Sequence, residues 1–338
     1  MKNDIAERIL RFEPRITVSH PQAQSIFQEV LRDRVELLYY LSGYSYSVRY
    51  SSLVVELSYT NQDVPVGSIK KIKSPEELEH LLHKSVEASS PKIVACVPSS
   101  MRVDRIYSDF NVGYGGYYSN LVNTEYSTSG FEGTGVIFVT FKFTYRISRI
   151  KLIMMESAVD KEVERLSRVL FLPEMSKEEK AYIAHNYLAK TVEYWLKKDA
   201  TPHEMSYMQS AYGALINHKC VCQGYAEAYK RLLDYVGIEC HVICGKIKGS
   251  DEHHAWNAVS FDGLTFHHVD VTWDSRGGGV VETEYFCLSD KDLQPHRLWS
   301  RLSDIICPGG KNILRTVRAS LAMNRSRYIA KGVDGRYL

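Results

Sequence analysis

The chain has 338 residues, of which 44% are hydrophobic and 24% are charged, and its 42 lysines and arginines nearly balance its 40 acidic residues. A net charge of +2 excludes the proteins that bind nucleic acids or anionic membranes mainly through charge, so we expect no nucleic-acid partner. No stretch approaches the roughly 20 apolar residues of a membrane-spanning helix, so we expect no membrane span. The length exceeds that of most single hydrophobic cores and predicts two domains.

The first residues and the cysteines bear on the cellular compartment. Residues 1–8 include acidic side chains where a signal peptide would carry its apolar core. We therefore expect a cytoplasmic protein if this is the full native chain, and an exported one if a leader was removed. The seven cysteines are an odd number, which argues against a complete disulfide framework and predicts at least one free thiol.

Residues 1–155 alternate between strand patterns and amphipathic helix patterns. Ser74 followed by Pro75 is typical of a helix start. The other expected elements are strands at 15–18, 51–60, 92–97 and 135–147 and a helix at 24–39. We therefore predict an N-terminal mixed α/β, β-rich region built from two copies of a helix-plus-strand unit. Residues 111–133, rich in Gly, Tyr, Ser and Asn, are expected to form a long excursion from the sheet.

The second half begins with two helical patterns. Residues 151–170 form the first, and Ser176 with Glu179 three residues later has the spacing of a capping box at the start of a helix that runs to about Trp195. We predict a domain at 156–300 and a basic C-terminal tail at 301–338. The basic side chains from Arg297 onward are expected to form a solvated face, with attachment to a partner or an acidic polymer as the alternative.

Cys222 immediately precedes a helix pattern that Gly237 ends. The free amides and the dipole at a helix N-terminus stabilise a thiolate, and the same amides bind a developing oxyanion. Gly224, in the first turn, would leave room for a substrate backbone. Cys220 is a rival nucleophile, but the helix start favours Cys222, which leaves Cys220 as a small buried residue.

Two extended segments, 253–259 and 267–274, flank a turn signal at Phe261-Asp262-Gly263. A three-residue loop centred on Asp262 would place His254 and Asp270 opposite each other on one face of the ribbon. A two-residue loop of Asp262 and Gly263 would place them on opposite faces. A thiol, an imidazole that takes its proton, and a carboxylate that orients the imidazole form a catalytic triad, so we predict the first loop.

Three blocks, at 222–226, 254–257 and 269–274, resemble the core motifs of the transglutaminase-like superfamily, with the order and separation of its bacterial members. The flanking segments 211–215 and 285–290 are also similar. The resemblance covers about residues 160–300 and implies an α+β, papain-like fold in which the helix that carries the cysteine packs on an antiparallel sheet. It assigns nucleophile, base and orienter to Cys222, His254 and Asp270. The superfamily contains peptidases, peptide N-glycanases, transglutaminases and inactive members.

These residues predict acyl transfer through a thioester at Cys222, with a peptide or protein substrate and no cofactor. Hydrolysis of a peptide or related amide is the first hypothesis. Protein cross-linking by amine transfer is the alternative, although no segment resembles a calcium site. A catalytically silent binding or scaffold module is the hypothesis from another class, and the competent residues at all three triad positions count against it.

Five further residues are candidates with more than one interpretation. Trp256 and Trp273 are core aromatics, walls of the substrate cleft, or both. Gln209 and Tyr212 are candidates for a second oxyanion donor. Asp274 is a rival to Asp270 as orienter, but by its place in the motif it caps or turns the chain instead.

A zinc site is the competing hypothesis for the cysteines and histidines of 220–268. The candidate ligands are Cys220, Cys222, Cys240, Cys244, His253, His254, His267 and His268. No Cys-x-x-Cys pair occurs among them, and neighbouring histidines on a strand point to opposite faces. We therefore predict no metal, with Cys240 and Cys244 as buried free thiols on one strand face.

Overall fold

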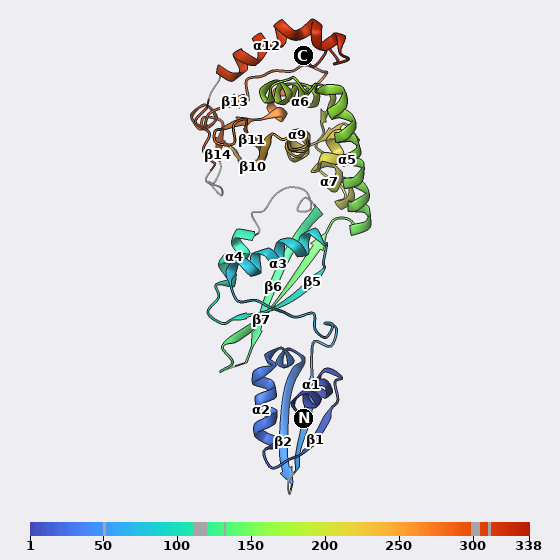
Figure 1. The fold of residues 1–338 in the computed structure, drawn as a ribbon, viewed down its shortest axis with the longest axis vertical. Helices are drawn as coiled ribbons and strands as arrows, with labels where there is room; N and C mark the ends of the chain where they lie inside the picture. Colours follow the sequence, from blue (N-terminus) through green and yellow to red (C-terminus); the bar gives the residue numbers. More distant parts are fainter. Residues whose placement is uncertain (50–51, 111–119, 132, 299–304, 310–311) are drawn as a thin grey trace. The chain divides into compact units, whose positions relative to one another are not determined.

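The computed structural model describes residues 1–338 except 50–51, 111–119, 132, 299–304 and 310–311 (Figure 1). It divides into two compact units. The N-terminal unit consists mainly of Met1–Gly113 and Asn123–Thr144, and the C-terminal unit mainly of Tyr145–Leu338. Among the described residues, no helix combines the length and the apolar character needed to cross a membrane.

The N-terminal unit contains two sheets, with strand orders β1-β3-β2 and β4-β5-β7-β6. Its elements are, in chain order, α1 (Lys2–Leu10), β1 (Arg15–Ser19), α2 (Ala23–Asp33), the 3-10 helix η1 (Val35–Tyr40), β2 (Leu41–Arg49), β3 (Ser52–Tyr59), β4 (Lys70–Lys71), α3 (Pro75–Glu87), β5 (Lys92–Pro98), α4 (Val103–Phe110), β6 (Leu121–Gly130) and β7 (Val136–Tyr145). The helix start at Ser74-Pro75 is confirmed, because the Ser74 hydroxyl accepts the Glu77 amide at 3.3 Å. The two sheets differ in strand number and pairing, so they do not establish a repeated helix-plus-strand unit. That repeat stays a prediction.

Two expectations for this unit were wrong in part. The helix expected at 24–39 is interrupted, because α2 ends at Asp33 and the chain continues as η1. The excursion expected at 111–133 contains β6, which pairs at the edge of the second sheet, while residues 111–119 lie outside the described residues. Most side chains of β6 are exposed. An edge strand exposed in this way can be rich in polar residues, which explains why its composition looks like that of a loop.

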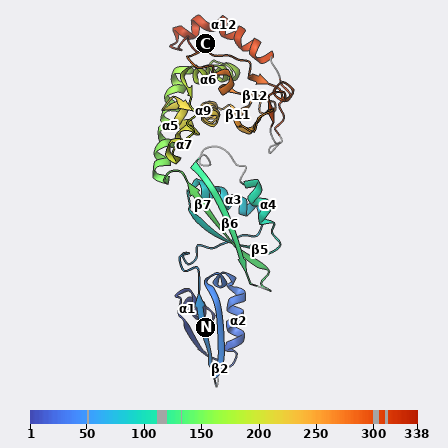
Figure 2. The ribbon, with the colours of Figure 1, turned by 180° about the vertical axis from the view of Figure 1, so that it is seen from behind.

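The C-terminal unit is built on a five-stranded sheet with the order β13-β12-β11-β10-β14. Its elements are α5 (Arg149–Leu170), α6 (Lys177–Thr191), β8 (Glu193–Tyr194), α7 (Pro202–Met208), α8 (Ala211–Leu215), β9 (Lys219–Cys220), α9 (Cys222–Tyr235), β10 (Glu239–Ile247), β11 (His253–Ser260), β12 (Phe266–Val269), α10 (Val271–Asp274), β13 (Phe286–Leu288), α11 (Asp290–Leu293), β14 (Arg297–Leu298) and α12 (Asn312–Ala330). Neighbouring strands of this sheet are antiparallel, and α9 packs on β10 and β11 (Figure 2). This arrangement confirms the predicted fold class.

The helix α9 is central to the hydrophobic core of this unit. Leu232 and Leu233 are fully buried, and Tyr229 is buried with its hydroxyl donating to the Ala181 carbonyl of α6 at 3.1 Å. Burial of one such side chain contributes about 1.5–3 kcal/mol. The core therefore fixes α9 between α6 and the sheet. The capping box at Ser176 is also confirmed.

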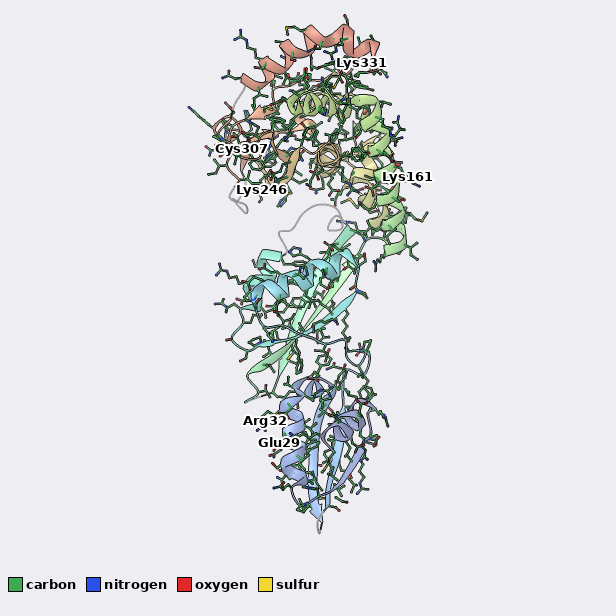
Figure 3. The ribbon with its side chains drawn as sticks, viewed as in Figure 1. Glu29, Arg32, Lys161, Lys246, Cys307 and Lys331 are labelled. Atoms are coloured by element: carbon green, nitrogen blue, oxygen red, sulfur yellow. The ribbon has the colours of Figure 1, made fainter. Side chains whose placement is uncertain are left out.

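The C-terminal helix α12 completes the same core. It lies beside α6 (Figure 1). It buries one apolar face, while most of its basic side chains are exposed. The Tyr328 hydroxyl donates to the buried Glu179 carboxylate at 3.2 Å. Lys331, just beyond the helix, forms an ion pair with Glu174 (Figure 3). The basic segment expected as a solvated tail thus contributes an apolar face to the second unit.

Candidate active site

Cys222 is the first residue of α9, and its side chain is partly exposed. In the first turn of α9 the Gly224 amide donates to the Val221 carbonyl at 2.9 Å, which leaves the amides of Cys222 and Gln223 for an anion at this place. Cys220, the rival thiol, is fully buried in β9. Its burial raises the pKa of the thiol well above the ordinary value. Of the two thiols, only Cys222 has both access to solvent and a helix N-terminus.

Gly224 allows close packing inside the unit. A Cβ atom at this position would lie 2.5 Å from the Cβ of Cys220 and 2.9 Å from the carbonyl oxygen of Met208. Real Cβ atoms essentially never come so close to other heavy atoms, so only glycine fits here without a shift of its neighbours. The space at its α-carbon is filled by the protein itself. Packing thus accounts for the glycine, and the expectation that Gly224 leaves room for a substrate backbone stays a prediction.

The hairpin between β11 and β12 brings His254 and Asp270 together in a register that differs from the predicted one. Ser260 pairs with Phe266, so the loop has five residues instead of three. In this register the position opposite His254 is two residues beyond Asp270. The two residues still share a face, because the register moved by an even number of positions.

Asp270 ends the extended segment instead of continuing it. The expected strand at 267–274 was wrong beyond Val269, because α10 begins at Val271 and Asp270 is its N-cap. One carboxylate oxygen, Oδ1, accepts the Trp273 amide at 3.2 Å, and the other, Oδ2, lies 2.8 Å from Nε2 of His254. The cap therefore fixes the carboxylate while its second oxygen contacts the imidazole.

His254 connects this carboxylate to the thiol. Nε2 of His254 faces Asp270, which leaves Nδ1 on the other side of the ring, and the side chains of His254 and Cys222 interact. Burial disfavours the charged imidazole, but the Asp270 carboxylate and the contact with Cys222 outweigh it and raise the pKa of His254 to about 9. The site thus favours an imidazolium beside the thiol.

Arg297 is a residue of the candidate site that sequence reasoning missed. It was expected on a solvated face, but its side chain is fully buried and its Nη2 lies 2.6 Å from Oδ2 of Asp270. The pKa of Asp270 is lowered even though burial opposes ionisation, because His254 and Arg297 stabilise the carboxylate. The short strand β14 brings Arg297 here by pairing with Ile247 of β10. A two-residue strand leaves no periodic signal in the sequence.

The two tryptophans flank the His254 ring. Trp256 is fully buried among apolar residues of the core, and its ring is stacked at 6.0 Å from that of His254. Trp273 is less buried and meets the imidazole edge-on at 6.3 Å. Trp256 is therefore a core aromatic in contact with the site. Trp273 combines packing with partial exposure, so its role as a cleft wall stays a prediction.

The remaining candidates lie in other environments. Tyr212 of α8 stacks on Tyr207 at 5.3 Å, and Gln209 is the C-cap of α7. Their role as oxyanion donors stays a prediction. Asp274 is fully buried, with its Oδ2 2.9 Å from Nε2 of His185 on α6. It therefore anchors the end of α10 to α6 instead of orienting His254.

One group of three side chains among the described residues has the composition of a metal site: His268, Asp290 and Cys307, whose ligand atoms lie within 4.8 Å of one another. Of these, Cys307 is labelled in Figure 3. Trp256 donates its Nε1 proton to Nδ1 of His268 at 3.1 Å, so Nδ1 is unprotonated and Nε2 carries the proton that faces Asp290. A histidine that binds a metal through one nitrogen normally donates a proton from the other. The hydrogen bonds present do not fit a metal ion here.

The match of a family model spans the first two sequence blocks and the start of the third. The model of the transglutaminase-like superfamily matches residues 165–271. Kyphoscoliosis peptidase of Homo sapiens and that of Mus musculus are each 35% identical over 79 residues, which cover 20% of this chain and only 11% of either relative. A solved structure of a TGase is 13% identical, and the matched part covers 63% of this chain and 61% of the TGase chain. Its TM-score of 0.31 is too low to support an argument. The family match identifies a transglutaminase-like domain in this chain.

Proposed function

We propose that the C-terminal unit is a thiol-dependent acyl-transfer enzyme in which Cys222 is the nucleophile, His254 the base and Asp270 the orienter. The observation that supports this most strongly is the buried His254, whose Nε2 lies 2.8 Å from Asp270 and whose side chain interacts with that of Cys222. A buried histidine–carboxylate pair also occurs as a structural feature elsewhere in the unit. What distinguishes this pair is the partly exposed thiol at a helix N-terminus beside it.

In this proposal His254 holds the proton of Cys222, and the thiolate attacks the carbonyl carbon of an amide. The first-turn amides of α9 stabilise the oxyanion that forms. As the carbon–nitrogen bond breaks, His254 gives its proton to the leaving amine, and a thioester to Cys222 remains. His254 then removes a proton from the incoming water or amine, which attacks the thioester and frees the thiol. Asp270 supports the charged imidazole throughout.

We favour hydrolysis of a peptide or related amide. The curated relatives are peptidases by name, and the family match is compatible with such an activity. Amine transfer uses the same thioester and differs only in the group that attacks it, so it remains the alternative. A silent scaffold would need neither a partly exposed thiol nor a buried imidazole that interacts with it, and both are present.

The test is the pH dependence of iodoacetamide labelling, with each modified cysteine located by peptide mass mapping. We expect Cys222 to react fastest of the seven cysteines. His254→Ala should abolish this preference. His241→Ala, which removes an exposed histidine of the same sheet, is the matched control and should leave it unchanged. Labelling of Cys222 that is slow or indifferent to His254 would favour the scaffold.

A second assay separates hydrolysis from amine transfer. The protein is incubated with an unfolded protein substrate and a fluorescent primary amine, and the products are followed by mass spectrometry. New amino termini with no incorporated amine indicate hydrolysis. Incorporation of the amine without cleavage would overturn our preference and support the cross-linking alternative. Cys222→Ala should abolish either product.

A further inference from the structure

We propose that Arg297 is a positioning residue of this site, which holds the Asp270 carboxylate and the Trp273 ring in the arrangement that orients His254. This proposal rests on the proposed function, because it concerns the residue that orients the base. Arg297 acts through Asp270 and is not expected to touch the substrate.

The hydrogen bonds of Asp270 define the first part of the argument. Oδ2 lies 2.8 Å from Nε2 of His254 and 2.6 Å from Nη2 of Arg297, while Oδ1 accepts the Trp273 amide. Three donors from three separate segments thus hold the two oxygens. The histidine and the helix cap each hold one oxygen of the carboxylate. The arginine adds a charged donor on the oxygen that faces His254 and so holds that oxygen more firmly.

The contacts of the guanidinium define the second part. Its central carbon lies 3.9 Å from the centre of the Trp273 ring, and Nη1 donates to the His296 carbonyl at 3.2 Å. A flat guanidinium can stack on an aromatic ring and bind a carboxylate with its edge at the same time, which a lysine cannot do. Arg297 therefore links the orienting carboxylate to the tryptophan that flanks the imidazole.

Burial shows that this arrangement is energetically demanding. The Arg297 side chain is fully buried, and its Nε has no hydrogen-bond partner among the described residues. A buried ion pair gains little over apolar residues of the same volume, and an unpaired donor adds a further penalty. Stability alone is thus a poor reason for an arginine here. A charge that fixes the orienter of the base is a sufficient one.

The arginine also changes the electrostatics of the base. Arg297 and His254 both contact Asp270, so the positive charge of Arg297 lies near the imidazole and disfavours its charged form. The hydrogen bond from Arg297 keeps Asp270 ionised. The other titratable groups around this pair come from several elements and are Cys222 of α9, His268 of β12, Tyr285 before β13 and Asp290 of α11. Loss of Arg297 should therefore raise the pKa of His254 and loosen the geometry of its partner.

The test measures both effects on the full chain. The pKa of His254 is followed by NMR of its ring protons in a Cys222→Ala background, and amide hydrolysis is measured with the thiol present. Arg297→Met should raise the pKa of His254 by about one pH unit, the lower end of the effect of a nearby charge. Arg297→Lys should keep the pKa closer to that of the unsubstituted protein but lower kcat about tenfold, since the geometry is lost while the charge remains.

Arg276→Met is the matched control, because Arg276 lies in the same unit but pairs with Glu282 at the surface. It should change neither quantity. An unchanged pKa of His254 in folded Arg297→Met, or full activity in Arg297→Lys, overturns the proposal. If Arg297→Met fails to fold, Arg297→Lys still decides. Failure of the proposed function gives a different result, namely slow labelling of Cys222 in the unsubstituted protein.

Discussion

The raised pKa of His254 makes the stability of the C-terminal unit depend on pH. The imidazole is buried and paired with Asp270, and its pKa is about 9 in the folded protein, against an ordinary value of 6.5. One pKa unit corresponds to about 1.4 kcal/mol. The rise in the pKa of His254 on folding therefore stabilises the folded unit by about 3 kcal/mol when the imidazole is charged. That is a large part of the stability of a typical domain, which is about 5–15 kcal/mol.

The sign follows from the direction of the change. Because the pKa is raised on folding, the folded state binds the proton more tightly than the unfolded chain does. The stabilisation is fully present below pH 6.5 and is lost as the pH rises through 9. His254→Gln removes the titrating group. The difference in unfolding free energy between the two proteins should thus shrink by about 3 kcal/mol from pH 6 to pH 10.

Urea unfolding followed by tryptophan fluorescence measures this difference. All four tryptophans lie between residues 195 and 299, so the signal reports on the C-terminal unit. His241→Gln is the control, because this exposed histidine also contacts a carboxylate, that of Glu239, but lies outside the site. A difference between His254→Gln and the unsubstituted protein that stays constant with pH would refute the reasoning. It would mean that the pKa of His254 is the same in the folded and the unfolded protein.

Two further predictions concern packing. Gly224→Ala should destabilise the C-terminal unit by about 1–3 kcal/mol, because the added methyl group meets Cys220 and the Met208 backbone. Stability equal to or above that of the unsubstituted protein in the urea assay would show instead that helix propensity dominates, since alanine favours a helix by about 1 kcal/mol over glycine. Leu321→Ala should cost about 2–5 kcal/mol because Leu321 is buried where α12 meets the core, whereas Met323→Ala, at a position that is 83% exposed, should change little in the same assay. Equal effects at the two positions would mean that α12 does not stabilise the unit.

The parts of the structure that the sequence predicted well are those with a local physical signal. The start of α3 at Ser74-Pro75 and the capping box at Ser176 depend on residues a few positions apart. The strand β6 was not predicted, because a polar edge strand has the composition of a loop. The length of the hairpin loop was predicted wrongly for a different reason. The Asp262 carboxylate accepts the amides of Leu264 and Thr265, which closes a wider turn than the glycine alone suggested.

The residues of the candidate site also divide into those with a local sequence signal and those without one. The wrong loop still placed His254 and Asp270 on one face, because the alternation of a strand conserves the face whenever the register moves by two. Arg297 could not be found in this way, since it reaches Asp270 from a strand of two residues after a separate turn. Its role depends on burial, and a basic residue among other basic residues carries no sign of burial. Local patterns can therefore locate the groups that would react, while the charges that set their pKa values depend on contacts between distant segments.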